Sequence, residues 1–180
     1  MPVHEMAYRK LWDLLLFGEI APVQAATIQG LVERLEAGMT PVREAIRRLT
    51  SEGALILQDN RHIIFPELSN RNMSELYFLR KTLEPQLVAL ATACANKEDI
   101  VRLALIDSDL DQAINTGDIN LYLRKNYEFH KELYRLADAP ILETVADGLW
   151  MRYGTSLRVV CGRVRTLSLT DQYKETLATM

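Results

Sequence analysis

Arginine side chains gather in one short stretch of the sequence, and their spacing suits contact with nucleic acid. Arg43 and Arg47 are four residues apart, so on an α-helix they project from the same face. A guanidinium group can donate two parallel hydrogen bonds to a guanine edge or to a phosphate. Arg61 and His62 follow at the tip of an expected β-hairpin, where they could reach the minor groove or the phosphate backbone. These four residues are therefore candidates for contact with DNA.

The elements that would position these side chains follow the order of a winged helix-turn-helix. Apolar residues recur at i, i+3, i+4 and i+7 in successive segments, and two β-rich runs separated by Asp59-Asn60 come next. The expected helices lie at about 6–17, 27–36 and from residue 40, and the expected strands at about 54–58 and 61–65. In the third helix the apolar residues leave Arg43 and Arg47 facing outward, with Glu44 and Arg48 beside them.

Thr40 and Pro41 mark the expected start of this third helix. Threonine is a good N-cap, and proline at the first helical position gives up no hydrogen bond. The free N–H groups at a helix N-terminus also suit a phosphate. Thr40 and Pro41 therefore join the candidate DNA-binding residues.

After residue 68 only long helical patterns remain. Residues 69–73 are polar and are interpreted as a linker. The helices expected beyond it lie at about 74–95, 97–115, 118–138 and 140–165, with another that starts near Thr170. The sequence thus predicts a mainly α protein, with a winged helix-turn-helix and a two-stranded β-hairpin wing in residues 1–68. An all-α antiparallel helical bundle would follow in residues 74–180.

Composition limits the classes of protein to which the chain can belong. It has 180 residues, 48% of them hydrophobic and 25% charged, as in ordinary globular proteins. The sequence has no apolar run near the roughly 20 residues of a membrane span and no secretory signal pattern, so we expect a cytoplasmic protein. Its net charge of -3 means that DNA contact must come from a local basic patch. No catalytic constellation is visible in the sequence, so we do not expect an enzyme.

The DNA-reading segment resembles a known family. Residues 40–49, which read TPVREAIRRL and precede Glu52-Gly53, resemble the recognition-helix signature of the GntR family of bacterial transcription regulators. Residues 79–85 (LRKTLEP) and 129–134 (FHKELY) resemble the FCD effector domain of the FadR subfamily. The resemblance implies a homodimer whose recognition helices enter successive major grooves of a near-palindromic operator.

One departure from the family pattern bears on affinity. Family members usually carry Ser or Thr and then Arg before the Thr-Pro pair, and this chain has Gly38 and Met39 there. Met39 cannot replace the charge or the donors of an arginine. Thr40 and Arg43 match the family's DNA-contacting positions. The sequence therefore predicts weak binding or an unusual operator.

The FCD resemblance implies that the helical domain binds a small organic acid. Arginine suits planar anions, so Arg80 and Arg152 are candidates for holding a carboxylate, with Tyr134 and Tyr153 as further candidates. Asn126 and His130 are also effector candidates, because their i, i+4 spacing places them on one helix face; Tyr173 completes the set.

A divalent metal is the cofactor that related FCD domains suggest. Metal-binding members have Asp-x-x-x-His on this helix and two further histidines on later helices. Here Asn126 stands at the Asp position, Tyr173 at one His position, and the last histidine would lie beyond Met180, because the domain is short at its C-terminal end. His130 is the clean match, and one imidazole cannot hold a metal with useful affinity. We therefore expect no tightly bound ion.

An alternative remains open for the whole chain. A winged helix that has lost DNA binding could serve as a helical protein–protein interaction module. DNA binding that falls steeply with salt favours the regulator, because phosphate contacts release counterions. Binding that ignores salt favours the module.

Overall fold

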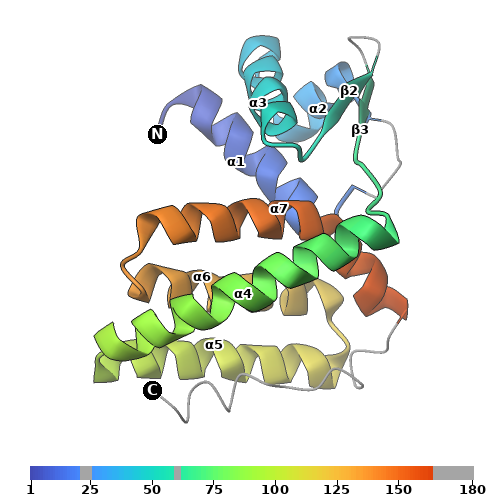
Figure 1. The fold of residues 1–180 in the computed structure, drawn as a ribbon. Helices are drawn as coiled ribbons and strands as arrows, with labels where there is room; N and C mark the ends of the chain where they lie inside the picture. Colours follow the sequence, from blue (N-terminus) through green and yellow to red (C-terminus); the bar gives the residue numbers. More distant parts are fainter. Residues whose placement is uncertain (21–25, 59–61, 164–180) are drawn as a thin grey trace. The chain divides into compact units, whose positions relative to one another are not determined.

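The structure is a computed structural model that describes residues 1–20, 26–58 and 62–163. These residues form two compact units (Figure 1). The N-terminal unit comprises Met1–Met73 together with Trp150–Ser156, and the helical unit comprises Ser74–Leu149 with the described residues from Leu157. The domain boundaries expected at residues 68 and 74 stay a prediction. The N-terminal compact unit also includes a short piece of a later helix, Trp150–Ser156.

Three helices and a small sheet make up the first part of the N-terminal unit. They are α1 (Val3–Leu16), β1 (Ala26–Thr27), α2 (Ile28–Leu35), α3 (Met39–Ser51), β2 (Ile56–Gln58) and β3 (His62–Ile64). The core between them is apolar and includes Leu11, Leu31, Ile46, Ile63 and Phe65. This is the winged helix-turn-helix that the sequence predicts.

The wing differs from the expected two-stranded hairpin by one strand. The sheet is antiparallel with the order β1-β3-β2, because Ala26 pairs with Ile63 and Thr27 with His62. A strand of two residues is too short to give an alternating pattern, so the sequence alone did not indicate it. Thr27 also caps α2, since its hydroxyl accepts a hydrogen bond from the Gly30 amide at 3.0 Å. The expected turn at Asp59-Asn60, and Arg61 after it, lie outside the described residues.

The start of α3 also differs from the prediction that Thr40 is the N-cap. Gly38 is the N-cap, in an extended conformation with φ -67° and ψ 159°, and no side chain caps the helix. Pro41 therefore occupies the third helical position, where a missing N–H still costs no intrahelical bond. As a consequence Met39 becomes the first residue of the helix.

Four long helices follow, and none of the helices described combines the length and apolarity that a membrane crossing requires. They are α4 (Asn70–Cys94), α5 (Lys97–Thr116), α6 (Ile119–Leu136) and α7 (Pro140–Arg163). Helix α4 begins earlier than expected, because the Ser69 hydroxyl accepts from the Asn72 amide at 3.1 Å and the Asn72 side chain accepts from the Ser69 amide at 3.4 Å. The helix expected near Thr170 lies outside the described residues.

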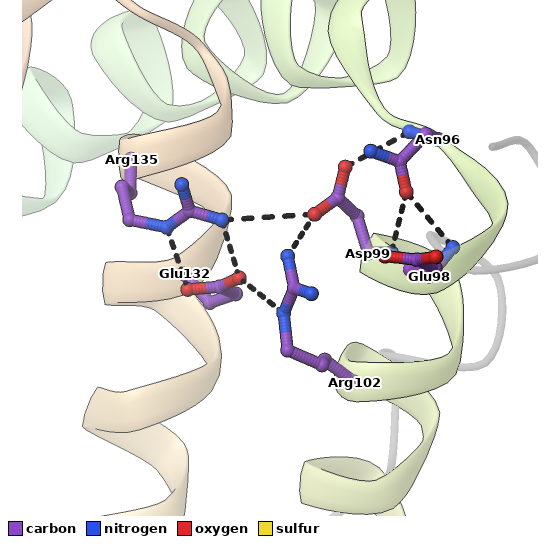
Figure 2. A network of polar contacts seen from close by, with 6 residues as sticks. All are labelled: Asn96, Glu98, Asp99, Arg102, Glu132 and Arg135. Carbon is purple, nitrogen blue, oxygen red and sulfur yellow. Dashed lines mark hydrogen bonds and ion pairs between the residues drawn. The ribbon is translucent and has the colours of Figure 1, made fainter.

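Helices α5 and α6 form an antiparallel pair that a polar network joins (Figure 2). Asp99 is 5% exposed, completes a capping box with Asn96, and bonds to Arg102. The Glu132 carboxylate on α6 accepts hydrogen bonds from Arg102 at 3.2 Å and from Arg135 at 2.7 Å. Acidic and basic side chains therefore alternate in this contact between α5 and α6.

Candidate nucleic-acid interface and effector site

The outward face of α3 is the candidate DNA-reading surface. Its apolar residues, Val42, Ala45, Ile46 and Leu49, are buried in the core as predicted. Thr40, Arg43, Glu44 and Arg47 are exposed, and Pro41 is partly exposed. The 3.6-residue period thus places the core residues on one side and the candidate DNA contacts on the other.

Arg48 differs from its neighbours on the same helix. Its guanidinium bonds to Glu5 on α1 and to Glu52 at the end of α3, each at 3.1 Å. It also lies 3.7 Å above the ring of Tyr8. In contrast, neither Arg43 nor Arg47 forms a hydrogen bond or an ion pair with the part of the chain that the structure describes. The sequence grouped these three arginines, and among the described residues Arg48 alone of the three forms ion pairs.

Tyr8 strengthens this contact between α1 and α3. Its hydroxyl donates to the Glu52 carboxylate at 2.8 Å. Burial raises the pKa of Tyr8 above its ordinary value, and the hydrogen bond to Glu52 raises it further. The phenol therefore stays protonated and keeps its role as a donor at neutral pH.

Two more exposed positions bear on the candidate interface, one on the wing and one at the start of α3. His62 is exposed on β3, on the wing. Met39 is 38% exposed at the first position of α3, one helical turn before Arg43. An exposed apolar side chain therefore stands at the N-terminal edge of the recognition surface.

In the helical unit, several effector candidates meet at one polar cluster between α4 and α6. The Arg80 guanidinium bonds to the Glu84 carboxylate at 2.7 Å, and the Tyr134 hydroxyl donates to the same oxygen at 2.8 Å. The Tyr134 hydroxyl also lies 3.4 Å from Nδ1 of His130. Asn126, one turn before His130, is 5% exposed. Sequence reasoning missed Glu84, although its i, i+4 spacing from Arg80 is a signal for an ion pair.

His130 is neutral at physiological pH. Burial lowers its pKa to about 4, while the Glu84 carboxylate raises it and the Arg80 guanidinium lowers it by smaller amounts. A neutral imidazole is the form that binds metals. However, the described residues contain no group of three or more His, Cys, Asp or Glu side chains that could hold an ion. The described residues around His130 thus do not fit a metal site.

The remaining effector candidates belong to the last part of the chain. Arg152 belongs to the N-terminal unit, where its guanidinium donates to the backbone carbonyl of Glu52 at 3.3 Å. Tyr173 lies outside the described residues. Tyr153, next to Arg152, is partly buried.

Fold and surface together define a winged helix-turn-helix protein with an all-helical second domain. Residues 3–64 match the model of bacterial regulatory proteins of the gntR family, and residues 75–179 match the FCD domain model. The chain belongs to the GntR family of transcription regulators that carry an FCD domain. It is therefore a DNA-binding transcription regulator and not an enzyme.

Individual relatives agree with this assignment. The chain is 30% identical over 157 residues to the HTH-type transcriptional regulator McbR of Escherichia coli K12. The match covers 87% of this chain and 71% of McbR. It is 34% identical to the Nta operon transcriptional regulator of Aminobacter aminovorans, over 64% of this chain and 55% of that protein. The solved structure of E. coli McbR/YncC matches with a TM-score of 0.89 at 28% identity, over 94% of this chain and 80% of that one.

Proposed function

We propose that this regulator represses transcription by binding an operator through the outward face of α3 and the wing. The contacts would come from Thr40, Pro41, Arg43 and Arg47 on α3 and from Arg61 and His62 on the wing. Residues 1–68 would form the DNA-binding domain, 69–73 the linker, and 74–180 the effector and dimerisation domain.

One observation carries the DNA-binding part of this proposal. Arg43 and Arg47 are exposed one turn apart and have no partner among the described residues, although acidic side chains engage Arg48 on the same helix. A guanidinium group without a protein partner can bond to a guanine edge or a phosphate without first breaking a contact within the protein.

A homodimer would place two such surfaces on one operator. Tyr77 and Phe78 on α4 are each 67% exposed, which leaves large apolar side chains for a second copy of the chain to cover. Sedimentation or light scattering of the full chain, alone and as Phe78→Glu, tests this. A wild-type monomer at micromolar concentration would contradict it.

The effector would be a small organic acid held at the polar cluster of Arg80, Glu84, Tyr134 and His130, with Asn126 one turn before His130 on the same helix. Arg80 is the cation of this cluster, and His130 is neutral. Since Glu84 already bonds to Arg80 at 2.7 Å, an incoming carboxylate would take the place of Glu84 on the guanidinium. Differential binding to two conformations of the dimer would then change operator affinity.

Selection of binding sequences from a random duplex library tests the DNA-binding part. We expect the wild-type chain to select a near-palindromic duplex, with affinity that falls steeply with salt. Arg43→Ala should weaken binding to that duplex by about 1–3 kcal/mol in an anisotropy titration. Arg124→Ala, which removes an exposed arginine from α6, is the matched control. Equal binding by Arg43→Ala and wild type would refute the assignment.

A thermal-shift screen with mono- and dicarboxylic acids tests the effector part. An acid that binds the folded chain raises its melting temperature. Arg80→Ala should abolish that shift, and Arg124→Ala should keep it. A hit that survives Arg80→Ala would place the acid elsewhere, and a shift produced only by uncharged compounds would rule out the acid class.

A further inference from the structure

Helix α7 contributes a piece of itself to the N-terminal unit. Met151 is 4% exposed and is part of the same apolar core as residues of α1 and α3. A winged helix-turn-helix does not need a distant helix for its own chain order, because its three helices and wing are contiguous in sequence. Met151 therefore makes α7 part of the core on which α3 packs.

Backbone contact between α7 and α1 reinforces that connection. A Cβ atom at Gly154 would lie 2.5 Å from the carbonyl oxygen of Leu16 and 2.8 Å from its Cα. Real Cβ atoms do not approach backbone so closely, so only glycine permits this packing. The α7 backbone thus lies directly against the last residue of α1.

Arg152, which lies between Met151 and Gly154 in the sequence, contacts the end of α3. Its Nη2 atom donates to the carbonyl oxygen of Glu52, the C-cap of α3, at 3.3 Å. The last carbonyls of a helix lack intrahelical donors and carry partial negative charge, so a guanidinium satisfies both needs. Gly53 permits the approach: its φ is +75°, and a Cβ atom there would lie 3.0 Å from Nη2 of Arg152.

Glu52 is consequently the meeting point of three helices. Its carboxylate accepts from Tyr8 of α1 at 2.8 Å and from Arg48 of α3 at 3.1 Å, while its carbonyl accepts from Arg152 of α7. Arg47 lies five residues before Glu52, which corresponds to about 7.5 Å along a helix axis. A shift of the Glu52 end of α3 therefore moves the guanidinium that would face DNA.

We propose that Arg152 is a positioning residue for DNA recognition: through the Glu52 carbonyl, α7 holds α3 in the orientation that reads base edges. The α7 residues before Trp150 are grouped with the helical unit. A rearrangement of α7 in that unit would thus reach α3 through the same hydrogen bond. The inference rests on the proposed DNA-reading role of α3 and adds a residue that does not touch DNA.

Binding of two duplexes to the full-length chain tests this. One duplex is the sequence that the wild type selects, and the other is the same composition scrambled. We expect Arg152→Ala to weaken binding to the selected duplex about tenfold while its affinity for the scrambled duplex changes less than twofold. Arg152→Lys, which keeps a cation and a donor, should recover part of the loss, and Arg124→Ala should bind both duplexes as wild type does.

A second measurement separates positioning from loss of folding. Hydrogen exchange should speed up at the C-terminal end of α3 in Arg152→Ala and stay unchanged in the α5–α6 pair. Wild-type selectivity in Arg152→Ala would overturn the inference. An equal loss of affinity for both duplexes would also overturn it, since such a loss reflects only the removal of a positive charge. If Arg43→Ala loses affinity for the selected duplex as expected while Arg152→Ala binds both duplexes as wild type does, this inference alone is refuted. If the wild type selects no duplex, both proposals fail.

Discussion

The Arg48 guanidinium lies 3.7 Å above the ring of Tyr8, and this pair joins the recognition helix to the first helix of the domain. Arg48 also bonds to Glu5 and Glu52. One arginine of the recognition helix is thus part of the scaffold, while Arg47 beside it has no hydrogen bond or ion pair with the described residues. The two side chains differ in their contacts although they are adjacent in sequence.

Arg48→Ala should therefore lower stability more than Arg47→Ala does. Exposed ion pairs contribute about 0.2–1 kcal/mol each and an exposed cation–π contact about 0.5–1 kcal/mol, so the expected loss is about 1–2 kcal/mol. Urea unfolding of both variants and of wild type measures it. Equal midpoints for the two alanine variants would show that the Arg48 contacts add nothing to the fold.

Met39→Arg should strengthen DNA binding. The side chain at this position is 38% exposed at the start of α3, and an arginine there would add a cation and a bidentate donor beside Arg43. We expect a gain of about 1 kcal/mol or more and a steeper dependence of affinity on salt. Met39→Gln, which adds polarity without charge, is the control. A Met39→Arg chain with wild-type affinity and salt slope would mean that this edge of α3 does not face DNA.

Gly154→Ala should destabilise the chain by about 2 kcal/mol or more, because its new methyl group would overlap the backbone of Leu16. Gly148 on the same helix is a matched control, since a Cβ atom there meets nothing within 4 Å. Gly148→Ala should leave stability unchanged or raise it by about 0.5–1 kcal/mol through better helix propensity. Thermal unfolding followed by circular dichroism compares the two variants. A tolerated Gly154→Ala would contradict the close packing of α7 on α1.

Stability should fall as the pH decreases from about 6.5 towards 4, in part because of His130. The folded pKa of His130 is about 4, below its ordinary value of 6.5, so in this window the unfolded chain binds more protons than the folded chain. The contribution of His130 to the free energy of unfolding is fully present above the pKa of the unfolded chain. It decreases as the pH falls towards the pKa of the folded chain.

His130→Gln should flatten that part of the stability profile, because glutamine does not titrate. Denaturant unfolding at several pH values between 4 and 7 gives the slopes, and His62→Gln on the exposed wing serves as the control. An unchanged slope in His130→Gln would mean that another group produces the acid sensitivity.

The sequence by itself determined the elements and the side of α3 that faces outward. The period of Val42, Ala45, Ile46 and Leu49 is a local property of the chain, so it predicted both the helix and the exposure of Arg43. The change to long helical patterns after residue 68 likewise predicted the all-α second half. These features depend on neighbours a few residues apart, which a linear reading can see.

Tertiary structure decided which partners these side chains have. Strand β1 exists because Ala26 and Thr27 meet β3, and Arg48 differs from Arg47 because Glu5 and Tyr8 lie beside it. Arg152, an effector candidate in the sequence, bonds to the Glu52 carbonyl at the end of α3, a contact that spans 100 residues of sequence. No local pattern encodes such distant pairs, because the free energy that favours them arises only when the core brings the helices together.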